Sequence, residues 1–173
     1  MSSTARAART VVLPPEEAEL LWMDVRRWPT FIEGFAHVER KDDNWPAEGS
    51  KLVWKSQPGG RGRVNERVMT RSHGELSARL VEESLTGVQT VRFHPADHGG
   101  TVVELSLEYD LNPTTVWRRG PLGVVVNALF IRRALADSLA RTLRRFATEA
   151  AEQQVLSALS DGSQSQVRPK EFQ

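Results

Sequence analysis

Apolar residues in the first part of the chain follow a strand pattern and then a helical one. Residues 7–13 form a largely β-branched run. Pro14-Pro15 ends it, because proline cannot donate to a strand ladder and suits the first turn of a helix. Apolar residues then recur at helical spacing over 15–24, Trp28-Pro29 breaks that helix, and residues 30–35 allow one further turn. The pattern predicts one strand followed by two short helices.

Beyond residue 35, apolar and polar residues alternate, which is typical of strands with one buried face. The alternation is clearest at 103–111, where one parity is apolar apart from the Tyr109 hydroxyl and the other is polar. The glycine-rich segment 58–62 predicts a hairpin loop. The expected strands are 35–41, 51–56, 63–71, 75–84, 88–95 and 103–111.

A long helical pattern without internal proline follows, from about residue 121 to residue 156. Its apolar residues recur every three or four positions, which gives the helix one apolar face. They are Ile131, Leu135, Leu139, Leu143 and Phe146. Residues 157–173 have no periodicity and contain Ser, Gln and Pro, so we expect a single domain over 1–156 and a disordered tail.

This order of elements predicts an α+β fold, in which a curved antiparallel sheet of six to seven strands wraps round the long C-terminal helix. The order resembles the START-like (SRPBCC) superfamily with the helix-grip fold, in its polyketide cyclase/dehydrase and lipid-transport branch. The resemblance covers about residues 6–153 and is carried by 12–14, 16–29, 31–39, Gly49, 99–103 and the closing helix. It implies a cavity between sheet and helix that holds an apolar small molecule.

Composition narrows the possible functions. A chain of 173 residues with 26% charged residues fits one globular domain, and a net charge of +1 argues against a nucleic-acid-coating protein. The absence of cysteine excludes disulfides and thiolate sites. His94, Asp97 and His98 share one tight turn, where three side chains rarely converge, so no metal or other cofactor is expected. Residues 1–10 lack the apolar core of a secretion signal, so we expect a cytoplasmic protein.

One segment combines apolar and basic residues. Trp117, Arg118 and Arg119 precede the apolar run 122–131, which Arg132-Arg133 follows. The run is too short to span a bilayer. We favour burial of this segment against the sheet, the short helices or a second subunit in a homodimer. The alternative is peripheral membrane contact, with these arginines on acidic headgroups.

A carboxylate interrupts the apolar parity of the strand at 63–71. If Val64 and Val68 face inward, Glu66 lies in an apolar pocket, where its pKa would rise and it could act as an acid. The simpler hypothesis, which we favour, is a strand charge paired with Arg79 across the hairpin. The candidate catalytic residues are Glu66, Arg67 and Tyr109.

The resemblance implies that the chain binds a hydrophobic small molecule, such as a lipid, a polyketide or a quinone-like compound, as a carrier or sensor. The expected contacts are the inward-facing residues of the strands and the long helix. They are Val38, Leu52, Trp54, Leu80, Val91, Phe93, Leu105, Leu107, Tyr109, Leu135 and Leu139. One alternative is an enzyme similar to the aromatic polyketide cyclases and dehydratases, and another is a protein-interaction module.

Overall fold

The computed structural model describes residues 2–112 and 121–164, with side chains for all of these except 121–129 and 161–164. Seven strands form one antiparallel sheet in the order β1-β7-β6-β5-β4-β3-β2. They are β1 (Ser3–Val11), β2 (Phe35–Lys41), β3 (Lys51–Ser56), β4 (Arg63–Ser72), β5 (Glu75–Val81), β6 (Leu85–Pro95) and β7 (Thr101–Leu111). The helices are α1 (Pro15–Met23), α2 (Trp28–Phe31) and α4 (Pro121–Gln164). The predicted α+β architecture is confirmed.

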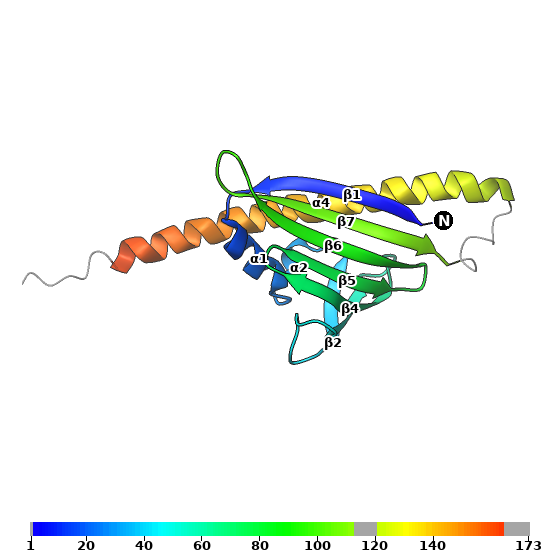
Figure 1. The fold of residues 1–173 in the computed structure, drawn as a ribbon, viewed down its shortest axis with the longest axis horizontal. Helices are drawn as coiled ribbons and strands as arrows, with labels where there is room; N and C mark the ends of the chain where they lie inside the picture. Colours follow the sequence, from blue (N-terminus) through cyan, green and yellow to red (C-terminus); the bar gives the residue numbers. More distant parts are fainter. Residues whose placement is uncertain (1, 113–120, 165–173) are drawn as a thin grey trace, which may run out of the picture.

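The long helix α4 crosses the sheet and packs mainly against β1 and α2 (Figure 1). Leu139, Leu143 and Phe146 of the predicted apolar stripe are buried, whereas Ile131 and Leu135 are only partly buried. Both ends of α4 extend past the sheet, the yellow N-terminal turns beyond the start of β1 and the orange C-terminal turns beyond α1 (Figure 1). The middle of α4 therefore contributes most of the contact with the body of the domain.

The C-terminal extension of α4 differs from the expected tail. The helix continues to Gln164, past the boundary predicted after residue 156. Val155, Leu156 and Leu159 are each more than half exposed, at 59%, 61% and 65%. Since this part of the helix does not pack against other described residues, it needs no apolar face. Its sequence therefore lacks the helical periodicity that would have predicted it. Residues 165–173 lie outside the described residues.

The aromatic core joins the three helices to the sheet. The Trp22 ring of α1 lies 5.5 Å from Phe31 of α2 and 5.2 Å from Phe146 of α4, measured between ring centroids. Phe93 of β6 is 6.4 Å from the same tryptophan, edge to face. This cluster fixes α1 and α2 as a corner at one end of the sheet, beside the middle of α4.

Four strands are longer than predicted: β4 by one residue, β7 by two at its start, and β1 and β6 by larger changes at their starts. β1 begins at Ser3 and ends at Val11, rather than covering 7–13, because pairing with β7 recruits the small residues before Ala7. β6 begins at Leu85 rather than at residue 88. A glycine at position 87 suggests a turn, but in the structure Gly87 lies within β6. A Cβ atom at this position would come within 2.4 Å of the Glu108 carbonyl oxygen on β7, so only glycine allows the two strands to lie this close.

Two further predicted boundaries also differ from the structure. β5 stops at Val81 instead of residue 84, because a turn begins in which the Glu82 amide donates to the Leu85 carbonyl at 3.0 Å. Trp28-Pro29, predicted as a helix break, forms the first turn of α2. The amide N–H groups of the first helical turn have no hydrogen-bond partner within the helix, so the N–H that proline lacks is not needed there.

Candidate functional site

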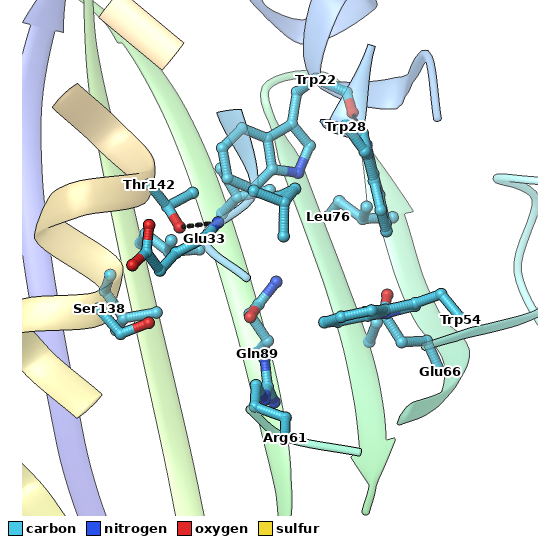
Figure 2. Close-up of a pocket in the computed structure, with 15 residues that line it drawn as sticks. Trp22, Trp28, Glu33, Trp54, Arg61, Glu66, Leu76, Gln89, Ser138 and Thr142 are labelled. Atoms are coloured by element: carbon cyan, nitrogen blue, oxygen red, sulfur yellow. Dashed lines mark hydrogen bonds between the residues drawn. The ribbon is translucent and has the colours of Figure 1, made fainter. Parts of the chain in front are cut away.

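A small cavity lies between the inward face of the sheet, the α1–α2 corner and the middle of α4. Its volume is about 40 Å³, room for about three water molecules. Figure 2 shows Trp54 and Glu66 on one side and Ser138 and Thr142 of α4 on the other. The complete lining is Trp22, Trp28, Ile32, Glu33, Trp54, Arg61, Glu66, Leu76, Ala78, Gln89, Val91, Leu105, Ser138, Leu139 and Thr142. The lining mixes aromatic, aliphatic and charged side chains, so it is more polar than expected.

Three tryptophans supply the aromatic part of the wall. Trp22 comes from α1, Trp28 from α2 and Trp54 from β3, and each is at most 4% exposed. The Trp28 indole N–H donates to the Trp22 carbonyl at 2.8 Å, which fixes that ring. Phe35 bridges Trp28 and Trp54, with its centroid 6.0 Å from the first and 5.4 Å from the second. These rings offer rigid flat surfaces for stacking.

Glu66 is the buried acid of the cavity. It is 6% exposed on β4, with Val64 and Val68 buried on the same parity, as the inward-facing hypothesis requires. The Trp54 indole N–H donates to Glu66 Oε1 at 2.7 Å. Burial raises the pKa of Glu66, while the Trp54 hydrogen bond and the Arg61 charge oppose the rise and Glu82 adds to it. The carboxyl group is thus biased toward its protonated, hydrogen-bond-donating form.

Arg61 and Glu82 form an ion pair next to Glu66. Arg61 Nε donates to Glu82 Oε2 at 2.8 Å and Nη2 to Oε1 at 3.2 Å, and the Glu82 side chain is only 1% exposed. The Arg61 guanidinium also lies 5.6 Å from the Trp54 ring centroid, within cation–π range. A donor-rich cation therefore faces the cavity beside a protonatable carboxyl group.

Sequence reasoning missed both members of this pair. Arg61 belongs to the glycine-rich loop between β3 and β4, where only the turn was recognised. Glu82 did leave a signal, because it extends the inward parity of Leu76, Ala78 and Leu80 by one more step. Gln89 left the same kind of signal on β6, between Gly87 and Val91 of the inward parity. Glu66 and Gln89 are thus polar residues on otherwise apolar parities, and both line the cavity.

Glu33 closes the cavity on the α4 side. Arg141 Nε donates to Glu33 Oε1 at 3.0 Å, and Arg145 Nη1 forms an ion pair with Oε2 at 3.0 Å. The Glu33 amide also donates to the Thr142 hydroxyl at 3.0 Å (Figure 2). Just before α2 in the chain, Arg27 donates to Glu149. We call these contacts the α2–α4 clasp, since they fasten the chain around α2 to the long helix.

The predicted ligand contacts divide into two groups. Trp54, Val91, Leu105 and Leu139 line the cavity. Leu52, Leu80, Phe93, Leu107 and Tyr109 are buried in the surrounding core, while Val38 and Leu135 are partly buried against it. The first group lies near the α1–α2 corner, so the cavity occupies only part of the space between sheet and helix.

The other catalytic candidates lie away from Glu66. Arg67 is exposed on the outer face of β4, opposite Arg79 of β5. Glu66 itself lies opposite Leu80 in the β4–β5 ladder, so the favoured pairing of Glu66 with Arg79 is wrong. The reason is strand parity, which places the two charges on opposite faces of the sheet. Tyr109 is buried beside β1. Burial raises the pKa of its hydroxyl group, and a hydrogen bond with Ser3 partly opposes that rise.

The basic, apolar segment before the middle of α4 is only partly described. Trp117, Arg118 and Arg119 lie outside the described residues, as do the side chains of 122–129. Phe130 is 72% exposed, and Arg132 and Arg133 are exposed beside it. The first turns of α4 extend beyond the sheet and so do not cover it (Figure 1). Within the described residues, no helix is long and apolar enough to cross a membrane.

The sequence matches the family model described as polyketide cyclase / dehydrase and lipid transport, over residues 3–151. The chain belongs to this family. The match covers all seven strands and the part of α4 that packs on them, so the resemblance noted from the sequence is confirmed. None of the curated proteins compared with the chain matches it.

Solved structures share the fold at low sequence identity. The ZhuI aromatase/cyclase from Streptomyces sp. R1128 has a TM-score of 0.71 at 13% identity, over 88% of this chain and 96% of that one. A protein from Thermus thermophilus, TTHA0849, gives 0.68 at 18% identity, over 87% and 99%. Norcoclaurine synthase from Thalictrum flavum gives 0.62 at 13% identity, over 89% and 97%. These likenesses establish the helix-grip fold.

Proposed function

We propose that this chain binds a hydrophobic small molecule in the cavity between the sheet and α4, as a carrier or sensor. The observation that carries the proposal is the buried Glu66 carboxyl group facing a cavity walled by three tryptophans. An aromatic or polycyclic ligand would stack on these rings, and its burial would supply most of the affinity.

The polar groups of the cavity favour an uncharged ligand with one or two acceptor oxygens. A protonated Glu66 carboxyl group adds no charge, and the charge of Arg61 is balanced by Glu82. A carbonyl or phenol oxygen of the ligand can accept hydrogen bonds from Glu66 and Arg61. A ligand carboxylate would lie next to the acidic side chains of Glu66 and Glu82, which disfavours its binding. We therefore expect neutral ketones and phenols to bind more tightly than fatty acids.

Ligand binding requires the cavity to widen. Pockets for drug-sized ligands measure about 300–1,000 Å³, compared with about 40 Å³ here. The α2–α4 clasp borders the cavity through Glu33 and Thr142, and its contacts are polar and partly exposed. Separation of the two sides of the clasp would enlarge the cavity without breaking the strand ladder.

The binding test uses a matched pair of probes. Titration with 2-naphthol, monitored by tryptophan fluorescence, should show saturable quenching, and 2-naphthoate should bind at least about tenfold more weakly at neutral pH. Native mass spectrometry of the protein purified from its own host should reveal a co-purified small molecule. An empty protein that also binds neither probe would overturn the proposal.

A second candidate function is a cyclase- or dehydratase-like reaction in the same cavity, and the environment of Glu66 favours it. An enol carbon of the substrate would attack a carbonyl carbon of the same molecule and form a C–C bond. The protonated Glu66 carboxyl group would give its proton to the carbonyl oxygen and the resulting carboxylate would take up the enol proton, while Arg61 would stabilise the charge that develops on the oxygen. With an identified substrate, Glu66→Gln should abolish turnover and leave binding within about threefold. Unchanged turnover would remove Glu66 from the mechanism.

Contact with a membrane would give such a carrier access to a lipid-soluble ligand. The exposed Phe130, Arg132 and Arg133 support this extension of the proposal, because aromatic and basic side chains favour anionic interfaces. The protein should float with vesicles of anionic phospholipid, and Arg132→Glu with Arg133→Glu should abolish flotation. Failure of the wild-type protein to float would exclude membrane contact and leave ligand binding untouched.

A further inference from the structure

β1 is the strand at one edge of the sheet. β1 is the first strand of the sheet order and pairs with β7 in uninterrupted register from Ser3 to Val11. No strand among the described residues pairs with its outer edge. The other edge strand, β2, pairs with β3 through two register shifts, which disrupt its geometry. β1 is therefore the edge better shaped to accept an added strand.

A groove runs beside this edge, between β1 and α4. It has a volume of about 320 Å³ and is lined by Ala8, Arg9, Asp137, Ala140, Arg141, Leu143 and Arg144. Ala8 and Arg9 are neighbours in a strand and so point to opposite faces, which places the groove along the strand edge. The small Ala8 and Ala140 side chains leave room there for another chain.

The groove is basic. Arg9 and Arg144 are exposed, and no carboxylate of the described residues lies within ion-pair distance of either. Arg141 is paired with Glu33, so it adds no net charge, and Asp137 is the one acid in the lining. The groove is therefore complementary to a partner that carries carboxylates.

We propose that the β1–α4 groove binds an extended acidic peptide segment of a partner protein, which adds to the sheet as a strand beside β1. The peptide backbone would pair with the free edge, and carboxylates on one of its faces would meet Arg9 and Arg144. A second copy of this chain fits poorly, because its own β1 contains two arginines and no acidic residue.

The test uses the full chain and short labelled peptides. An eight-residue peptide of alternating Val and Glu presents all its carboxylates on one face when extended. Fluorescence anisotropy should show saturable binding of this peptide that weakens with salt. A Val–Lys peptide should not bind. A Val–Glu peptide with alternate amides N-methylated keeps its charge but loses one hydrogen-bonding edge, so its binding should be at least about tenfold weaker.

Variants of the protein test the location. Arg9→Glu with Arg144→Glu should weaken Val–Glu binding at least about tenfold. The control, Arg40→Glu with Arg79→Glu, makes the same change in net charge at exposed positions of β2 and β5 and should have little effect. Circular dichroism would verify that both variants fold.

Three results would overturn the proposal. Equal binding of the N-methylated peptide would mean that charge alone attracts the probe and that no strand is added. Equal weakening by the two double variants would place the site elsewhere. The third result is a dimer in sedimentation experiments that persists when the Val–Glu peptide is added but dissociates in the variant Arg9→Glu with Arg144→Glu. Such a dimer would mean that a second copy of the chain occupies the groove.

Discussion

At the scale of single residues, the buried Glu66 carboxyl group gives the clearest prediction. Burial raises its pKa above the ordinary value of 4.5, so the folded state binds its proton more tightly than the unfolded state does. This contribution to stability is complete below pH 4.5 and is lost as pH rises through the raised pKa. In that window the loss is about 1.4 kcal/mol per pH unit.

Glu66→Gln removes this titration and keeps an oxygen for the Trp54 indole N–H. The unfolding free energy of the variant should therefore rise relative to wild type as pH increases above 4.5, and then level off. Urea denaturation between pH 4 and 8 measures the difference. The matched control is Glu108→Gln at an exposed position of β7. A pH-independent difference for Glu66→Gln would contradict the raised pKa.

The Arg61–Glu82 pair gives a second prediction at this scale. Arg61→Ala leaves the Glu82 carboxylate, which is 1% exposed, without its cation, so the variant should lose about 3 kcal/mol. Arg63→Ala removes an arginine that is 60% exposed and pairs with Glu39, and should cost less than about 1 kcal/mol. Urea unfolding distinguishes the two, and equal losses would show that Arg61 forms an ordinary surface pair.

The sequence revealed only part of this cluster. Strand parity offered an inward-facing Glu66 as one of two hypotheses, because Val64 and Val68 mark that face over a short local window; the favoured alternative, pairing with Arg79, was wrong. Its surroundings involve Trp54, Arg61 and Glu82, which lie on other elements, and the loop that carries Arg61 has no periodicity to read. Local patterns thus located the acid, whereas its partners depend on tertiary packing.

At the scale of elements, the α2–α4 clasp should control opening of the cavity. Glu33→Gln removes the charge that holds Arg141 and Arg145, so the backbone around Glu33 should open more often. Amide hydrogen exchange should become about tenfold faster at residue 33, whose N–H donates to Thr142.

The control for the clasp is Glu152→Gln, which removes an exposed carboxylate from the same helix. It should leave exchange near α2 unchanged. Added salt should speed exchange in wild type toward that of Glu33→Gln, since exposed ion pairs are screened. Identical exchange in all three proteins would mean that packing, and not the ion pairs, holds the corner closed.

Elements with strong local patterns were predicted closely. β2 and β3 have the predicted bounds, and α4 begins at the predicted residue. The errors occur where tertiary contacts override local preference. β1 extends through small residues that pair with β7, and β6 extends through Gly87, where the close approach of Glu108 leaves no room for a side chain.

At the scale of the whole molecule, the order of elements predicted a sheet and a helix with facing apolar surfaces, and the resemblance to the family implied a cavity between them but not its size. Its lining comes from both short helices, five strands, two connecting segments and α4, so its volume depends on side-chain packing across the domain. The expected apolar pocket is smaller and more polar, because inward-facing Glu66 and Gln89 and loop-borne Arg61 occupy it. A sequence pattern fixes which face is buried, but not how completely the face is filled.

Burial along α4 changes sharply near residue 150. Phe146 and Ala150 are fully buried, whereas Val155, Leu156 and Leu159 are mostly exposed, so the helix stabilises the domain only up to about residue 150. A chain truncated after residue 156 should keep its unfolding free energy within about 0.5 kcal/mol of the full chain. Truncation after Arg145 removes the Phe146 ring that contacts Trp22 and Phe31, and should cost at least about 3 kcal/mol. Thermal and urea unfolding of both truncations measure this, and a large loss in the longer one would place the exposed end of α4 within the folding unit.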